Sequence, residues 1–433
     1  MNKELSYAET WRFLDNLQFF KIKLGLDSMT DFLGRLGHPE DNLRFIHIGG
    51  TNGKGSTAMS LRAILSRAKL KVGLYTSPHL SSVRERFQIN DALISEEDFA
   101  RHAARIMAVM NDQQITYFEF TTTLALLWFA EQKVDLAILE VGMGGRLDAT
   151  NVITPLITII TNVSMDHENY LGRTLPKVAA EKAGIIKSGV PLISGVLSPA
   201  AREVIERRAA ALAAPLRRLK RDFTMSQDGT GTGWRYKSES RDMEGLELAL
   251  RGSYQGGNAA LAIAALDGLA AHGIRVDDED IRAGLKTVRW PGRMEFLNVA
   301  GQDYLLDGAH NPAGVEALIE ALADFSDHRL IMIWASMADK DYSLCLKRIA
   351  PFCQSLIFAR PEENRSATPA QLRKALGPDS PPSYSSDSVD EALKTAQSFT
   401  QAGDLIVVAG SLYLVGKVRE ILSGPVTGKK TNG

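Results

Sequence analysis

The sequence predicts an α/β fold with two sheet-containing domains, and three observations lead to this prediction. Short apolar segments that suit buried strands alternate with longer segments of helical periodicity, which is typical of parallel sheets covered by helices. A polar, glycine-rich stretch from about Arg217 to Leu250 interrupts this alternation, and Trp290-Pro291-Gly292 interrupts it again. The chain has 433 residues, which suits two or three domains at about 150 residues each.

The first domain is predicted over residues 1–290, with a parallel sheet of the type that carries a phosphate-binding loop. Its expected strands are Arg44–Ile48, Lys71–Tyr75, Asp135–Val141 and Leu156–Thr161. Its expected helices are Ser56–Ala68, Glu96–Met110, Phe120–Lys133, Gly256–His272 and Asp277–Lys286. Ser95 is a good N-cap for the second of these helices, which has acidic residues in its first turn. The stretch from Arg217 to Leu250 is expected to form a small inserted antiparallel sheet.

The alternation restarts after Trp290 and predicts a second, smaller, Rossmann-like α/β domain over residues 291–423. Its expected strands are Tyr304–Leu306, Arg329–Trp334, Ser355–Ala359 and Leu405–Val408. Its expected helices include Pro312–Ala323 and Val389–Thr400. The polar, glycine-rich residues 424–433 are expected to form a disordered tail.

Composition excludes several classes of protein. Lys plus Arg is 50 and Asp plus Glu is 51, so the basic excess of a general nucleic-acid binder is absent. Two cysteines, Cys345 and Cys353, do not make a disulfide framework or a structural zinc site. Apolar runs such as Leu124–Ala130 are far shorter than the roughly 20 residues that span a bilayer, and Glu4 and Glu9 stand where a signal peptide would be apolar. We therefore expect a cytoplasmic protein that binds neither nucleic acid nor membrane.

The clearest local motif is a phosphate loop at Gly49-Gly50-Thr51-Asn52-Gly53-Lys54-Gly55-Ser56-Thr57. It follows a predicted strand and opens a predicted helix, which is the context that such a loop requires. Glycines let backbone N–H groups turn toward phosphate oxygens, and the helix N-terminus adds partial positive charge. Lys54 can reach the outer phosphates, and Ser56 or Thr57 can approach a metal ion. The motif predicts a nucleoside triphosphate site, although Gly55 intrudes between Lys54 and Ser56 in the usual pattern.

The loop resembles that of folylpolyglutamate synthases and dihydrofolate synthases, which belong to the Mur ligase group. Further matches follow in the family's order over Leu24 to about Gly416. They are Tyr75–Leu80, Leu139–Asn151, Asp166-His167, Glu181–Ile185, Gly257–Ala259, Pro291–Arg293, Leu306–Pro312 and Gly410–Tyr413. The resemblance implies that a carboxylate attacks the γ-phosphate of ATP to give an acyl phosphate, which the amine of L-glutamate then captures as an amide. Because a carboxylate is a poor electrophile at neutral pH, one of its oxygens must first become a leaving group.

Four residues are expected to hold Mg²⁺. Glu140 ends a buried strand, where ligands of open α/β sheets bind, and its carboxylate suits Mg²⁺, although it could instead cap nearby N–H groups. The resemblance assigns metal contacts to His167 and Ser77, against the alternatives of a structural histidine and a simple turn residue. Composition alone would leave Lys182 solvated, as a lysine on a helix. The resemblance instead implies that Lys182 is carbamylated, so that it becomes an anionic metal ligand, and that it is catalytic.

The resemblance also assigns residues to ATP and to the incoming L-glutamate. The ATP set is Asn52, Gly53, Lys54, Gly55, Ser56, Thr57, Asn258, Arg293 and Asp307. Asn258 could instead be an N-cap, whereas Arg293 is placed to clamp phosphate as the domains close. His310 and Ser411 are expected to bind glutamate, with His310 and Lys54 among the catalytic residues. His310 could equally cap the helix that begins near Pro312.

The pterin-bearing substrate, dihydropteroate or folate, is expected against the first domain. The candidate residues are Gly25, Leu26, Asp27, Thr116, Tyr117, Phe118, Glu119, Leu147, Asp148 and Ala149. Tyr117 and Phe118 could stack on a flat ring or could belong to the core.

Three alternatives remain open at this point. The enzyme could add the first glutamate to dihydropteroate, extend folate, or do both, and we expect a bifunctional monomer. A cell-wall Mur-type ligase is less well supported, because those enzymes place Ser or Thr directly after the loop lysine. A regulatory nucleotide switch would need a guanine-reading Asn-Lys-x-Asp motif, which the sequence lacks.

Overall fold

The computed structural model describes residues 6–17, 25–110, 115–229, 233–362 and 365–424. The first domain is built on an eight-stranded sheet with the order β4-β3-β2-β5-β1-β6-β7-β8. Its strands are β1 (Phe45–Gly49), β2 (Val72–Tyr75), β3 (Phe87–Ile89), β4 (Ala92–Leu93), β5 (Leu136–Glu140), β6 (Ile157–Ile160), β7 (Leu192–Ser194) and β8 (Leu216–Arg218). The neighbours from β2 to β8 pair in parallel, whereas β3 and β4 add antiparallel strands at one edge.

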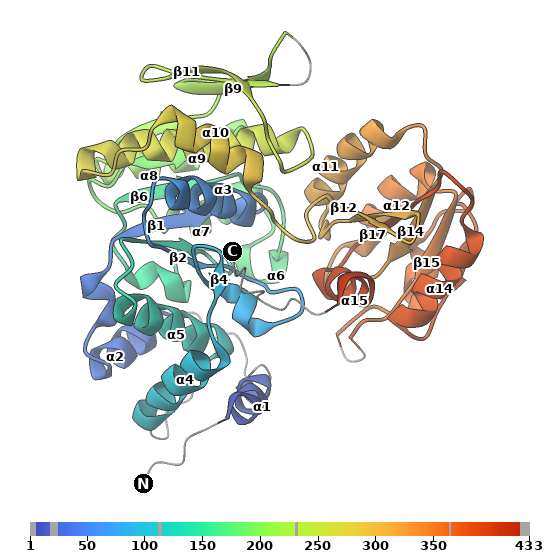
Figure 1. Ribbon diagram of the computed structural model, residues 1–433, viewed down its shortest axis with the longest axis horizontal. Coiled ribbons are helices and arrows are strands. Elements are labelled where there is room, and N and C mark those ends of the chain that lie inside the picture. The colour runs from blue at the N-terminus through green and yellow to red at the C-terminus, as the bar shows by residue number, and fades with distance from the viewer. Residues whose placement is uncertain (1–5, 18–24, 111–114, 230–232, 363–364, 425–433) are drawn as a thin grey trace.

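Helices cover both faces of this sheet, as Figure 1 shows. On one face lie α3 (Lys54–Arg67), α9 (Tyr254–Leu269) and α10 (Asp278–Thr287). On the other lie α1 (Tyr7–Leu17), α2 (Asp27–Arg35), α4 (Glu96–Met110) and α5 (Tyr117–Glu131). The helices α6 (Glu168–Leu171), α7 (Leu175–Ala183) and α8 (Pro199–Ala211) pack a third core beside β6 and β7. Two covered faces explain why β1 and β5 are buried along their whole length.

The predicted antiparallel insert is a three-stranded sheet, but it begins later than expected. Its strands are β9 (Phe223–Gln227), β10 (Trp234–Ser238) and β11 (Asp242–Leu246). Phe223, Tyr236, Met243 and Leu246 are buried in the core that contains α9. Arg217 lies outside this insert, because Leu216–Arg218 pairs in parallel with β7 and forms the edge of the large sheet. Because two of its three residues are arginines, the sequence of this short strand has no apolar pattern that would predict a place in the large sheet.

The second domain carries a six-stranded sheet with the order β12-β13-β17-β14-β15-β16. Its strands are β12 (Glu295–Val299), β13 (Gln302–Leu306), β14 (Leu330–Trp334), β15 (Ser355–Phe358), β16 (Ser383–Ser385) and β17 (Leu405–Ala409). Its helices are α11 (Pro312–Leu322), α12 (Tyr342–Ile349), α13 (Pro369–Ala375), α14 (Val389–Phe399) and α15 (Leu412–Ser423). Only β12 among these described strands pairs antiparallel, with β13.

The connection between the two sheets runs from Thr287, where α10 ends, to Glu295, where β12 begins. We place the domain boundary between residues 290 and 291 within this connection as a proposal, with the second domain over 291–423. The expected tail at 424–433 lies outside the described residues from 425 onward. Cys345 and Cys353 are buried and are not joined in a disulfide. Within the described part of the chain, the model contains no helix with the length and apolar character of a membrane span.

The crossing of α10 over α3 leaves no room for a side chain at Gly284. A Cβ atom built there would lie 2.6 Å from the Cα atom of Ile64. Because α3 begins at the phosphate loop, this close helix contact also fixes the position of that loop.

Gly284→Val should therefore lower the free energy of unfolding by about 1–3 kcal/mol, because the two helix backbones must separate. Urea denaturation followed by circular dichroism measures the change. Ala283→Val, at the neighbouring half-buried position of α10, is the matched control and should cost less. Equal stability of the two variants would contradict this account of the helix crossing.

Candidate active site

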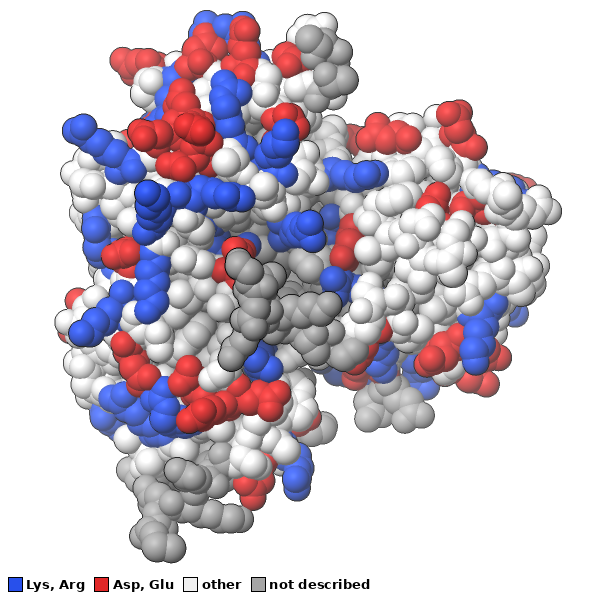
Figure 2. Space-filling model, in the orientation of Figure 1, with Lys and Arg blue, Asp and Glu red and all other residues white. Residues whose placement is uncertain are grey.

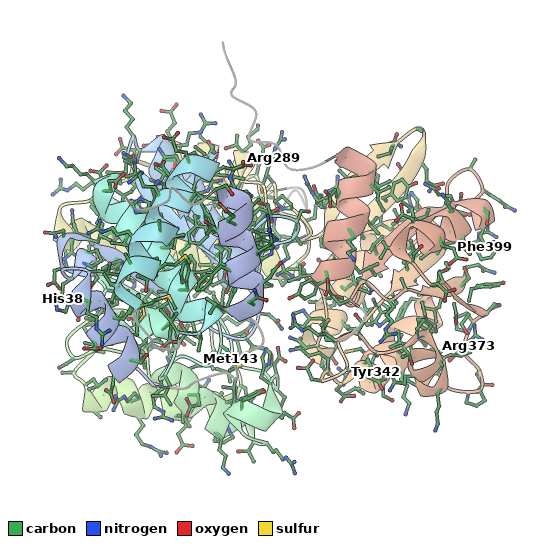
Figure 3. All side chains as sticks on the ribbon, turned by 90° about the horizontal axis from the view of Figure 1, so that it is seen from below. His38, Met143, Arg289, Tyr342, Arg373 and Phe399 are labelled. Atoms are coloured by element: carbon green, nitrogen blue, oxygen red, sulfur yellow. The ribbon has the colours of Figure 1, made fainter. Side chains whose placement is uncertain are left out.

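A cavity of about 770 Å³ lies between the two domains. The segments after β1, β5 and β6 line it from the first domain, as does α9, and the segment after β13 lines it from the second. These segments follow the carboxyl ends of their strands, which is where open α/β sheets bind ligands. Figure 3 shows the two domains from below, with the cavity residue Met143 on the first and Tyr342 on the second.

The phosphate loop forms one wall of the cavity. Gly50 has φ +143°, and a Cβ built on it would lie 1.9 Å from Oγ1 of Thr161, so no larger residue fits there. Gly53 has φ +81° and stands at the N-terminus of α3. Residues 50–56 all line the cavity. Ser56 therefore lies where the sequence predicted it, whereas Thr57 is fully buried behind the loop and its hydroxyl has no hydrogen-bond partner among the described residues.

Two lysines converge on one backbone carbonyl of this loop. Nζ of Lys54 donates to the carbonyl oxygen of Gly50 at 3.2 Å and to that of Thr51 at 3.0 Å. Nζ of Lys182, on α7, donates to the same Gly50 oxygen at 2.9 Å. Lys182 is only 3% exposed, and burial together with the nearby charge of Lys54 lowers its pKa to about 7. Composition alone would have left Lys182 in solvent, so its burial favours the assignment that the resemblance implied.

Glu140 ends β5 with its side chain buried and facing the cavity. Its Oε2 accepts a hydrogen bond from the backbone N–H of Ser77 at 3.0 Å. Burial raises the pKa of this carboxyl, and the charges of Lys54 and Arg293 oppose the rise. Among the described residues no cationic nitrogen lies within ion-pair distance of it. A buried carboxylate without a paired cation, with Ser77 and His167 on the same cavity, has the donor chemistry to hold Mg²⁺.

An interdomain network that sequence reasoning did not identify surrounds Asp166. Nζ of Lys340, from the second domain, lies 2.7 Å from Oδ1 of Asp166 and 3.2 Å from Nε2 of His167. Asn311 donates to Oδ2 of Asp166 at 3.1 Å. The charge of Lys340 lowers the pKa of Asp166 against the effect of burial, and burial lowers the pKa of His167. Lys340 follows the carboxyl end of β14. This position after a predicted strand is the one sequence feature that could have indicated Lys340 as a site residue.

A pair of amide side chains also joins the phosphate loop to the second domain. Nδ2 of Asn311 donates to Oδ1 of Asn52 at 3.1 Å, and Nδ2 of Asn52 donates to Oδ1 of Asn311 at 3.3 Å. Asn311 is also the N-cap of α11, because its Oδ1 accepts from the N–H of Gly314. The suggestion that His310 caps this helix is therefore wrong. His310 instead faces the cavity, with Nδ1 2.8 Å from the carbonyl oxygen of Gly308.

The other residues assigned to ATP also lie on the cavity. Arg293 lies in the connection between the domains, and Asp307 follows β13. Both oxygens of Asp307 accept backbone N–H bonds, from Met294 and Ala309. Asn258 sits inside α9, which begins at Tyr254, so the N-cap alternative for it is wrong. Its amide lies against Gly53, where a built Cβ would be 2.3 Å from Oδ1.

Three aromatic side chains that the sequence analysis did not single out also line the cavity. They are Trp234, Tyr254 and Trp290. Trp290 packs directly on Gly55 of the phosphate loop, and Trp234 packs on Gly256 of α9. Flat rings at the edge of a phosphate loop suit a purine base.

Ser411 and the residues expected to bind the pterin do not line the cavity directly. Ser411 is buried at the N-terminus of α15, with its Oγ 4.0 Å from Sδ of Met337, although its neighbour Leu412 lines the cavity. Gly25 and Leu26 precede α2, and Asp27 is its exposed first residue. Leu147 is half-buried and Ala149 is buried.

Most of the other pterin candidates have structural contacts of their own. Thr116 and Glu119 form a capping box at the start of α5. Asp148 accepts hydrogen bonds from the backbone N–H groups of Gly142 and Met143, so it shapes the loop that faces the cavity. Phe118 packs directly behind Gly142, where a built Cβ would lie 2.5 Å from its ring. Asp148 and Phe118 therefore lie in the layer behind Gly142 and Met143, which line the cavity.

Tyr117 has the core position considered for it, and its stacking on a pterin ring stays a prediction. Its ring packs against the apolar core, and the guanidinium of Arg86 lies 5.2 Å from the ring centroid. Its hydroxyl is buried without a hydrogen-bond partner among the described residues, and burial raises its pKa to about 12.

Comparison with known proteins agrees with this geometry. Residues 48–266 match the Mur ligase middle domain, and residues 292–412 match the Mur ligase glutamate ligase domain. The dihydrofolate synthase/folylpolyglutamate synthase of Bacillus subtilis is 37% identical, over 93% of this chain and 96% of its own. This chain belongs to that family of Mur ligases. The Escherichia coli enzyme of the same name is 33% identical over 96% of each chain.

Solved structures of this Mur ligase family agree over nearly the whole chain. Escherichia coli FolC in complex with DHPP and ADP superposes with a TM-score of 0.87 at 32% identity, covering 96% of this chain and 97% of its own. The Yersinia pestis bifunctional enzyme with AMPPNP and Mn has a TM-score of 0.86 at 32% identity, covering 96% and 98%. The chain is thus an ATP-dependent amide-forming ligase that uses a divalent metal ion, and the switch alternative is set aside.

Histidine protonation offers a test of the geometry in this ligase. Burial lowers the pKa of His310 to about 4, whereas Glu40 raises the pKa of the exposed His38. At about pH 6, NMR of the imidazole groups should show His310 neutral and His38 mostly charged. Since unfolded His310 regains an ordinary pKa near 6.5, its contribution to stability falls as pH drops through the window from about 6.5 to 4. A charged His310 at about pH 6 would contradict its burial.

Proposed function

We propose that this chain joins L-glutamate to dihydropteroate and to reduced folates, with cleavage of ATP to ADP and phosphate. The monofunctional alternative, in which it extends folates only, uses the same centre. The observation that carries the proposal is the convergence of Lys54 and Lys182 on the Gly50 carbonyl, inside a cavity that the glutamate ligase domain closes. Such a centre is built for a polyphosphate that must be held close to a second substrate.

In the first step, a carboxylate oxygen of the pterin substrate attacks the γ-phosphorus of ATP. The bond to the β,γ-bridging oxygen breaks, ADP leaves, and an acyl phosphate forms. Lys54 and the N–H groups of residues 50–56 bind the phosphate oxygens, and Arg293 adds a guanidinium from the domain connection. These fixed positive groups stabilise the charge that gathers during transfer.

In the second step, the amine of L-glutamate attacks the acyl carbon and phosphate leaves, which gives the amide. We assign His310 to this step. The carbonyl oxygen of Gly308 only accepts, so Nδ1 of His310 is the donor in their contact, and Nε2 is left as an acceptor for the glutamate amine. The low pKa of His310 keeps the imidazole neutral at pH 7. Ser411 is also assigned to the glutamate site, although it lies behind Leu412, which lines the cavity.

Mg²⁺ would be held by Ser77, Glu140, His167 and a carbamylated Lys182. Such an ion neutralises phosphate oxygens and so lowers the barrier to attack by an anion. Asn258 and Asp307 are assigned to the nucleoside part of ATP. The folate site is assigned to the surface that Phe118, Asp148 and their neighbours support. We further propose that the enzyme is a monomer and acts in the cytoplasm, where its substrate ATP is made available.

Incorporation of labelled L-glutamate tests the proposal. With ATP and Mg²⁺, the purified enzyme should add glutamate to dihydropteroate and to tetrahydrofolate. Product with tetrahydrofolate alone would select the monofunctional alternative, and no product with either substrate would overturn the assignment. Lys54→Ala should reduce incorporation at least a hundredfold while the melting temperature stays near that of the parent, because the phosphate anchor is lost.

The state of Lys182 can be tested independently of turnover. Its pKa of about 7 leaves much of the amine neutral at physiological pH, and a neutral amine attacks CO₂. Enzyme equilibrated with ¹³C-bicarbonate at mildly alkaline pH should show a protein-bound carbamate carbon by NMR. The signal should disappear in Lys182→Arg, whereas Lys187→Arg, at a half-buried lysine that follows in the chain, should retain it. A wild-type spectrum without a carbamate carbon would refute the carbamylation.

A further inference from the structure

A second hollow, of about 500 Å³, lies at the far end of α3 from the phosphate loop. Its polar lining comes from three places in the chain. Arg62, Ser66 and Arg67 lie on α3, Asp91 lies in the turn between β3 and β4, and Thr287 and Arg289 lie at the end of α10 and in the domain connection. It shares no lining residue with the cavity between the domains. In Figure 3 Arg289 lies toward the top of the view and the cavity residue Met143 toward the bottom.

Arg62 is the buried member of this group. Its side chain is only 6% exposed, and its guanidinium donates to the carbonyl oxygen of Asn90 and to Oδ1 of Asp91. Its Nε is buried without a hydrogen-bond partner among the described residues. Burying an unpaired donor of a charged group costs free energy, so its presence indicates a missing acceptor.

Arg67 and Arg289 flank Arg62 and are both exposed. Within the described part of the chain the side chain of neither arginine has a hydrogen bond or an ion pair. Asp91, which is 91% exposed, is the one carboxylate among the described residues that line the hollow, so three guanidinium groups face a single compensating charge there. Figure 2 shows several Lys and Arg side chains, with Asp and Glu side chains among them, on the face of the first domain that carries α3.

We propose that this hollow is a second anion site, which binds a small phosphate-bearing molecule such as inorganic phosphate or pyrophosphate. Guanidinium groups bind phosphate through pairs of parallel N–H bonds, and three of them line this hollow from two segments, α3 and the domain connection. The lining is too polar and too strongly charged to favour an apolar ligand.

Occupation of this site would join α3 to the domain connection. Arg62 lies eight residues after Lys54, or about 12 Å along the helix. Arg289 precedes Trp290, whose ring packs on Gly55 of the phosphate loop. A bound anion would therefore hold the connection against the helix that carries the loop.

Calorimetric titration of the full-length enzyme tests the proposal. Saturation with AMPPNP and Mg²⁺ first fills the phosphate loop, so that added pyrophosphate reports on other sites. The parent should bind pyrophosphate at one site, with an affinity that falls as salt is raised. The double variant Arg67→Ala, Arg289→Ala should bind at least tenfold more weakly, at an unchanged melting temperature. Inorganic phosphate in a parallel titration distinguishes a monophosphate ligand from a diphosphate ligand.

The matched control removes the same charge elsewhere. Arg105 and Arg208 are also exposed and have no ion pair among the described residues. Arg105→Ala, Arg208→Ala should leave pyrophosphate binding within twofold of the parent. An equal loss in this control, or no saturable binding by the parent, would overturn the proposal. Citrate binding more tightly than pyrophosphate would overturn the assignment to phosphate.

Discussion

Two lysine side chains, the half-buried Lys54 and the buried Lys182, meet at one carbonyl oxygen, and the rest of the site depends on this contact. Like charges repel strongly where water is excluded, and Lys54 and Lys182 both point at the oxygen of Gly50. The arrangement is stabilised only when negative charge is supplied. In the proposed reaction a polyphosphate would supply it to Lys54, and loss of the proton, followed by carbamylation, would supply it at Lys182. Burial, and after it the charge of Lys54, lowers the pKa of Lys182 to about 7, so the protein alone favours the neutral amine there more than at an exposed lysine.

The phosphate loop, the strands and most of the helices could be predicted from the sequence because their signals are local. Glu96–Met110 has the predicted bounds, since a cap and an apolar stripe mark it completely. The edge strands β3, β4 and β16 are two or three residues long and carry little hydrophobic pattern, so nothing in the sequence marks them. Arg217 was misplaced for the same reason.

Residues that act through partners far away in the chain could not be predicted in this way. Lys340 and Asp166 are 174 positions apart, and each looks like an ordinary surface charge until the domains are assembled. The same holds for Trp290, whose role depends on the absence of a side chain at Gly55. The residues proposed for the metal ion and the nucleotide were singled out because the family resemblance supplies long-range information. The resemblance did not distinguish Asp148, which shapes a loop, from residues that line the cavity.

The paired amides of Asn52 and Asn311 join the phosphate loop to the cap of a helix in the other domain. An amide pair carries no net charge, so it breaks and re-forms at little electrostatic cost. The phosphate loop, which is proposed to bind the nucleotide, therefore has this contact only when the second domain, which is proposed to bind the amino acid, lies against it.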